Sequence, residues 1–137
     1  MEPDEALVAR VRPPAVCEYW NLEFGSYWWA TFDYRYHHCA LNDHSGRIDE
    51  DGNLRFVVAH EDPGVHNWLD PVGHNEGYLS LRWMGSDSVP RPDVEIVKLS
   101  ELHSVLPESC AEASPESRRE LIEHHRRGLV RRWRLLV

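Results

Sequence analysis

The chain has 137 residues, 42% of them hydrophobic and 28% charged, which is the composition of one globular domain. It contains no apolar stretch of the roughly 20 residues that a membrane-spanning helix needs. Its acidic N-terminus also lacks the apolar run of a secretion signal. We therefore expect a cytoplasmic protein. The three cysteines, Cys17, Cys39 and Cys110, are odd in number and far apart, which argues against a disulfide framework and a cysteine-based zinc site.

The net charge of -8 is unevenly distributed along the chain. Residues 115–137 contain seven Arg and three Glu, whereas residues 1–114 contain eight Lys or Arg and twenty Asp or Glu. A basic tail on an acidic body is expected to dock on that body or on a partner. Nucleic acid is not an expected partner, because the body would repel phosphates and no basic and aromatic stripe is present.

Short apolar or alternating segments, separated by turn residues, predict a chain of strands. We expect strands at 6–12, 16–24, 54–60, 77–83 and 94–99, and a short extended segment at 37–42. Large apolar groups occupy both alternating sets of positions in 16–24, which indicates a strand covered on both sides. Residues 27–36 fit a short helix or turn as well as a strand.

A helix is predicted to begin at Ser114, because Ser is a good N-cap and Pro115 suits the first helical position. Apolar residues and His125 recur at helical spacing on one face, and Arg residues cover most of the remainder. The predicted fold is therefore mainly β. We expect residues 1–113 to form an antiparallel β-sandwich or a barrel-like fold, and an amphipathic basic helix over 114–137 to pack on it or extend from it.

The loop between the strands at 54–60 and 77–83 is the first candidate site. His60 and Asp62 share a face if the backbone is extended, and His74 follows across the loop. Two histidines and one carboxylate are the ligands of a facial triad for Fe(II) or a similar divalent ion. These three residues are the candidate catalytic or metal-binding groups, and no other cofactor is predicted. Alternatively, Asp62 accepts hydrogen bonds from the backbone of the following Pro63-Gly64 turn.

A second set of residues is a candidate ligand platform. Trp68 would stack on a sugar or aromatic ligand while Asn67 and Asp70 fix its orientation; alternatively, Trp68 anchors the loop in the core and the polar residues cap its turns. The other candidate ligand-binding residues are Trp28, Asp33, Arg35 and Arg82. The adjacent pairs His37-His38 and His124-His125 are interpreted as solvated or core histidines.

The same loop carries a family resemblance. The motif His60-x-Asp62-Pro63-Gly64, followed by Asn67-Trp68-Leu69-Asp70 and Gly73, resembles the family known as domain of unknown function 1214, as do segments 19–42, 51–83 and 94–102. Residues 114–133 are similar to the helical tail of some members. The resemblance implies a jelly-roll β-sandwich, usually preceded by another region, and implies little chemistry because the family has no agreed activity. His66 departs from the small residue or Pro expected in the loop.

Three functions fit these observations. The favoured one is a small-molecule-binding or accessory β domain, acting with a partner enzyme or with a further N-terminal region. The second is an enzyme with the His60, Asp62 and His74 site, with or without a metal, acting on a lipid, aromatic or carbohydrate metabolite. The third is a structural domain that joins a protein partner or a second copy through its β edges or its basic helix.

Overall fold

The computed structural model describes residues 1–133. Its elements, in chain order, are β1 (Glu5–Val11), β2 (Tyr19–Gly25), β3 (Ala40–Asn42), β4 (Leu54–Ala59), β5 (Trp68–Leu69), β6 (Tyr78–Met84), β7 (Asp93–Lys98), the 3-10 helix η1 (Leu99–Glu101), α1 (Leu102–Val105) and α2 (Pro115–Trp133). The strands expected from the sequence are confirmed with small shifts of their ends. Residues 134–137, which the predicted helix included, lie outside the described residues.

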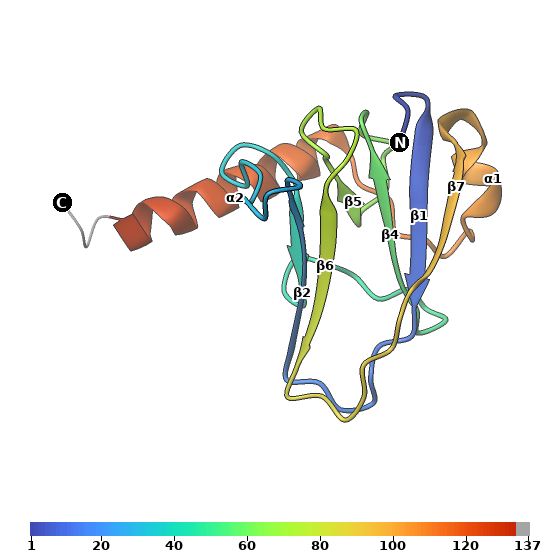
Figure 1. The fold of residues 1–137 in the computed structure, drawn as a ribbon, viewed down its shortest axis with the longest axis horizontal. Coiled ribbons are helices and arrows are strands. Elements are labelled where there is room, and N and C mark those ends of the chain that lie inside the picture. Colours follow the sequence, from blue (N-terminus) through green and yellow to red (C-terminus); the bar gives the residue numbers. More distant parts are fainter. Residues whose placement is uncertain (134–137) are drawn as a thin grey trace.

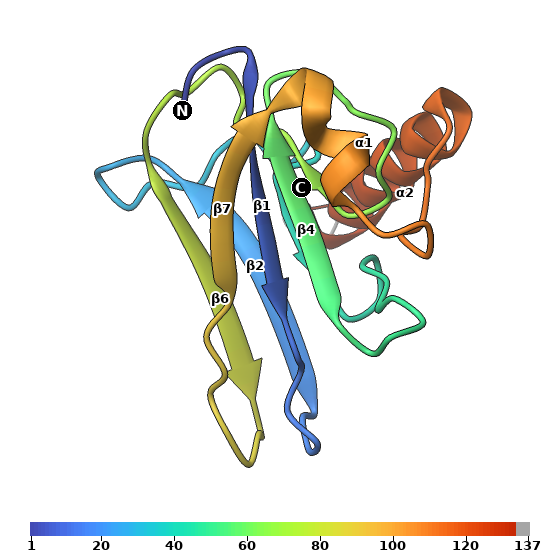
Figure 2. The same cartoon turned by 90° about the vertical axis from the view of Figure 1, so that its right-hand side faces the viewer.

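The strands form two sheets, one of order β5-β4-β1-β7 and one of order β3-β2-β6. All neighbouring strands pair antiparallel except β4 and the two-residue β5, which are parallel. Figures 1 and 2 show the two sheets as two layers with their strands running in similar directions. The predicted fold class, mainly β with a C-terminal helix, is confirmed.

The core has two parts, one on each face of the β1 and β4 strands. Between the sheets, Ala9 and Phe56 pack against Trp20 and Leu22 of β2. On the opposite face, Val8 and Val57 belong to a second cluster that includes Val65, Trp68 and Leu102. Successive strand residues point to opposite faces, so β1 and β4 are the strands buried on both sides.

Only one face of β2 is in the core, contrary to the expectation for residues 16–24. Trp20 and Leu22 are buried, whereas Tyr19, Asn21 and Glu23, on the opposite face, are partly or fully exposed. The alternating pattern was correct, but the apolar and polar groups of the outer face meet a cavity rather than a packed layer.

Residues 27–36 form turns, which is one of the alternatives that the sequence left open, and contain neither a helix nor a regular strand. Phe32 is buried and stacks on Phe24 at 6.1 Å between ring centroids, which anchors the segment. Tyr27, Trp28 and Trp29 are each at least 74% exposed.

Helix α2 begins as predicted, with the Ser114 hydroxyl accepting a hydrogen bond from the Ser117 backbone N–H at 3.1 Å. Arg118 is the one residue of α2 that is classed as buried among those described. The helix runs outward from the sheets, past β2, so that its C-terminal part lies away from the strands (Figure 1).

Candidate functional site

Asp62 braces the loop after β4. Its Oδ1 accepts a hydrogen bond from the backbone N–H of Gly64 at 2.9 Å, and its Oδ2 accepts one from Arg118 Nε at 3.0 Å. The Arg118 guanidinium is buried and also donates to the carbonyl oxygens of Val65 and His66. The Asp62 carboxylate therefore holds the loop and α2 together. This agrees with the alternative given above, in which Asp62 accepts hydrogen bonds from the backbone of the following turn.

The structure does not bring His60, Asp62 and His74 together as a set of metal ligands. His74 is exposed and stacks on Phe32, with 4.3 Å between ring centroids, and the buried Nε2 of His60 has no hydrogen-bond partner. Within residues 1–133, no three His, Cys, Asp or Glu side chains are grouped so that they could hold a metal ion.

Asn67 and Trp68 are likewise built into the scaffold rather than into a ligand platform. The buried Asn67 amide donates to the carbonyl oxygens of Arg47 and Arg55 at 2.6 and 2.7 Å. Trp68 is 8% exposed, and its Nε1 donates to the Ala59 carbonyl at 2.8 Å. Buried polar groups are satisfied in this way because an unpaired one is costly. Both residues hold the long loop onto β4.

The other candidate ligand-binding residues are dispersed over the surface. Asp70 caps a turn through the Val72 N–H at 2.7 Å and contacts His37 Nδ1, also at 2.7 Å. Trp28 is 83% exposed. Asp33 and Arg35 pair with each other at 2.9 Å, which lowers the pKa of the Asp33 carboxyl.

Arg82 does not join that pair. It donates to Glu23 Oε1 at 2.8 Å across the β2–β6 pairing.

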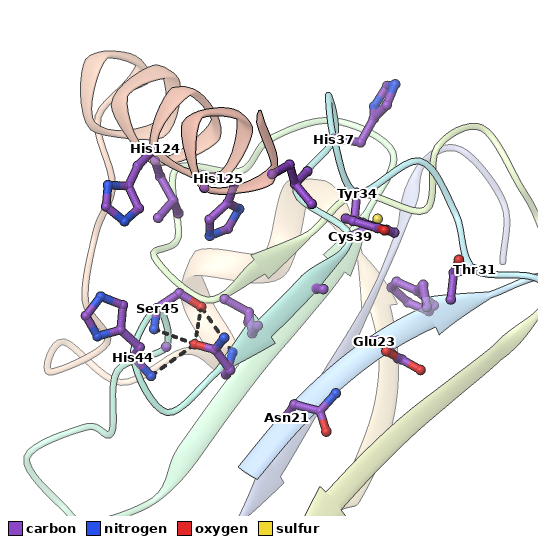
Figure 3. Close-up of a pocket in the computed structure, with 18 of the residues that line it drawn as sticks. Asn21, Glu23, Thr31, Tyr34, His37, Cys39, His44, Ser45, His124 and His125 are labelled. Atoms are coloured by element: carbon purple, nitrogen blue, oxygen red, sulfur yellow. Dashed lines mark hydrogen bonds between the residues drawn. The ribbon is translucent and has the colours of Figure 1, made fainter. Parts of the chain in front are cut away.

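A cavity of about 690 Å³ lies between the outer face of β2 and helix α2 (Figure 3). Alternation along β2 places Tyr19, Asn21 and Glu23 on one face, and the pairing with β3 adds Ala40 and Asn42 beside them. On the opposite side the helix contributes a stripe with three- and four-residue spacing, namely Leu121, His124, His125, Gly128, Leu129 and Arg132.

Two loops also line the cavity. The first follows β2 and contributes Thr31, Phe32, Tyr34, His37 and Cys39, and the second follows β3 and contributes His44, Ser45, Gly46 and Arg47. The Asn42 side-chain oxygen shapes the second loop by accepting hydrogen bonds from the backbone N–H groups of His44 and Ser45, at 3.0 and 2.9 Å.

Five of the lining residues are histidines: His37, His44, His66, His124 and His125. Burial lowers the pKa of His125, as do the neighbouring His124 and His44. Burial also lowers the pKa of His66, whose Nε2 lies 2.9 Å from the Ser45 carbonyl oxygen. Neutral imidazoles can both donate and accept hydrogen bonds, so these two rings offer versatile polar contacts at neutral pH.

The cavity offers binding groups rather than an assembled nucleophile. Burial raises the pKa of the Cys39 thiol to about 12, which keeps it protonated. The His37–Asp70 contact has the form of an oriented base, but Figure 3 shows the His37 ring directed away from Asn21 and Glu23.

Sequence reasoning missed this cavity. The adjacent histidine pairs were visible in the sequence. A loop histidine and a helix histidine come together only because α2 crosses β2, which brings the ring centroids of His44 and His124 to 6.5 Å from each other. The usable signal was the stripe on α2, where His124, His125 and Gly128 interrupt what would otherwise be an apolar face.

Two solved structures share this fold. An uncharacterised protein from Burkholderia cenocepacia is 38% identical over 73% of this chain, with a TM-score of 0.70. The VPA0106 protein from Vibrio parahaemolyticus is 20% identical over 70% of the chain, with a TM-score of 0.58, which supports the fold alone. The matches cover 28% and 26% of those two longer chains, so this chain corresponds to about a quarter of each.

The other comparisons found no relative. No protein-family model matches the chain, and no curated protein matches it. The resemblance to domain of unknown function 1214 therefore stays a prediction. None of the helices within residues 1–133 is long and apolar enough to span a bilayer.

Proposed function

We propose that this chain is a small-molecule-binding β domain whose ligand occupies the cavity between β2 and α2. The observation that carries the proposal is the cavity itself. Its volume of about 690 Å³ lies within the roughly 300–1,000 Å³ typical of ligand pockets. Its lining also combines aromatic and aliphatic walls with polar side chains that can fix the orientation of a ligand.

The position of α2 supports the same proposal. The helix is held to the body by Arg118, while Leu121 and Leu129, further along, are only partly buried and face the cavity. A bound apolar molecule would remove these side chains from water, which stabilises the complex by about 25 cal/mol per Å² of apolar surface covered. The ligand would thus complete the packing of α2.

The wider role is an accessory one within this proposal. Because the solved relatives are several times longer than the part matched, we infer that the domain works beside a further region or a partner enzyme. Membership of the domain of unknown function 1214 family is part of the same proposal. So is a cytoplasmic location, which the three free cysteines favour.

A neutral fluorescent probe tests the cavity. N-phenyl-1-naphthylamine brightens in apolar sites, and we expect saturable binding to the protein. A Cβ at Gly128 would meet no atom within 4 Å, so Gly128→Phe should fold and fill the cavity, while Gly128→Ala leaves it open. We expect binding to be lost in Gly128→Phe and kept in Gly128→Ala, with both melting as cooperatively as the parent. Equal binding by all three proteins would place the probe elsewhere and contradict the proposal.

An assembly role is a second candidate, favoured by one observation. Val94 and Ile96 of the edge strand β7 are 55% and 58% exposed. Exposed apolar edge strands are places where another chain adds to a sheet. This role does not exclude ligand binding.

A further inference from the structure

We propose that the ligand of this cavity is an organic anion, with an acidic head group joined to an apolar body. This inference rests on the proposed function, since it names the class of molecule that the same cavity binds. It is drawn from the charges of the lining side chains and from their spacing.

The lining has an excess of groups that bind anions. Besides the five histidines it includes Arg47 and Arg132. Both are exposed, and neither takes part in an ion pair among residues 1–133. Guanidinium groups without a carboxylate partner, beside apolar walls, are the usual means of recognising carboxylates and phosphates.

Negative charge in the lining is already neutralised. Glu23 is the one acidic residue among the described residues that line the cavity. Its Oε1 accepts a hydrogen bond from Arg82, which is outside the lining, at 2.8 Å. A cationic ligand would have to compete with Arg82 for this carboxylate and would meet Arg47 and Arg132 as like charges.

Two histidines bring hydrogen-bond donors from different elements into the cavity lining. The centroids of His44 and His124 are 6.5 Å apart, with one ring on the loop after β3 and the other on α2. A neutral imidazole carries one N–H donor, so this pair adds hydrogen-bond donors from two different elements to the lining of the cavity. His125 neighbours both rings in the cavity lining, so a third imidazole that can donate a hydrogen bond lies beside them.

The apolar body of the ligand has its own surface in the same cavity. Phe24, Phe32, Leu121 and Leu129 line it, and Phe24 and Phe32 stack on each other. A small inorganic anion would leave these side chains in water, whereas an amphipathic anion covers them. The charged and apolar side chains of the lining together therefore favour a molecule that has both an acidic head group and an apolar body.

A matched pair of probes tests the charge of the ligand. 8-Anilinonaphthalene-1-sulfonate and N-phenyl-1-naphthylamine share their ring system, but only the first is an anion. In fluorescence titrations of the full chain, we expect the sulfonate to bind at least fivefold more tightly. In the double variant Arg47→Gln/Arg132→Gln, the affinity for the sulfonate should fall about tenfold, while that for the neutral probe stays the same. Arg91→Gln, at an exposed arginine outside the cavity, is the control and should change neither.

The other outcomes are equally informative. If the neutral probe binds through the cavity at least as tightly as the sulfonate, or if the double variant binds both as before, the ligand is not an anion, although the cavity is still a binding site. If neither probe binds in a way that Gly128→Phe abolishes, both this inference and the proposed function are wrong.

Discussion

Two adjacent histidines show how strongly the surroundings decide what a residue does. His37 is partly exposed, and its Nδ1 lies 2.7 Å from Asp70 Oδ2. His38 is 1% exposed, and neither of its ring nitrogens has a hydrogen-bond partner. It packs between Trp68 and His125, with ring centroids 6.4 and 6.2 Å away. Such an unsatisfied buried ring lowers the stability of the fold.

The pKa of His38 is lowered from 6.5 to about 3, mainly by burial and to a smaller extent by the nearby Arg118, His125 and His66. The unfolded chain therefore binds a proton between these pH values that the folded protein excludes. The contribution of His38 to the free energy of unfolding is therefore highest above pH 6.5, where His38 is neutral in both states, and it decreases as the pH falls toward 3. From pH 7 to pH 5 the loss amounts to about 2 kcal/mol of the free energy of unfolding.

His38→Leu tests this account. We expect the variant to be at least as stable as the parent at pH 7, because no hydrogen bond is removed, and to lose about 2 kcal/mol less between pH 7 and pH 5. Urea denaturation at the two pH values measures the difference. His103→Leu, at an exposed histidine of α1, should keep the pH dependence of the parent. An unchanged dependence in His38→Leu would show that His38 is not the titrating group.

At the scale of elements, Arg118 makes the hydrogen bonds that hold the start of α2 to the loop after β4. Arg118 Nε donates to Asp62 Oδ2 at 3.0 Å and Nη1 donates to the His66 carbonyl at 3.0 Å. Its guanidinium carbon also lies 5.1 Å from the centre of the Trp68 ring. A planar guanidinium reaches all these partners at once, which a lysine cannot do.

We therefore expect Arg118→Met to free α2 from the body. The variant loses an ion pair that is buried on the arginine side, and the free energy of unfolding should fall by about 2–3 kcal/mol. Amide hydrogen exchange of residues 115–133 should accelerate, and the cavity should lose its affinity for the probes. Arg119→Met, at the adjacent exposed arginine, is the control. Equal effects of both variants would mean that the overall charge of the helix, and not this contact, holds it.

The sequence predicted elements well where local pattern decides them. Strand alternation, the turns and the Ser114 cap identified β1, β2, β4, β6, β7 and the start of α2. The sequence did not predict β5, which has only two residues and pairs parallel to β4. Its position is determined by the hydrogen bonds that anchor Asn67 and Trp68 to β4 and not by an alternating sequence pattern. The same anchors were foreseen as the structural alternative for that loop. The cavity could not be predicted, because it depends on how α2 crosses β2.

At the scale of the whole molecule, one side of the sandwich has two edge strands and exposed apolar side chains. β6 and β7 are edge strands of different sheets, and Figure 2 shows both at the same side of the molecule. In the β1–β7 pairing, Val94 and Ile96 lie opposite Ala9 and Leu7, whose side chains point toward the space between the sheets. Val94 and Ile96 are nevertheless mostly exposed. This side of the sandwich is therefore open, with apolar side chains and unpaired strand edges next to one another.

We expect this open side to mediate association with a second copy, because an exposed apolar edge strand favours pairing with another strand. The mass measured by light scattering should rise with protein concentration, and Val94→Lys/Ile96→Lys should hold it at that of one chain. Two control variants carry lysine at other exposed apolar positions, Ile48→Lys in the loop before β4 and Val130→Lys on α2. If Val130→Lys alone prevents association, the basic helix is the interface. If the parent stays a single chain at high concentration, the open side does not bind a second copy.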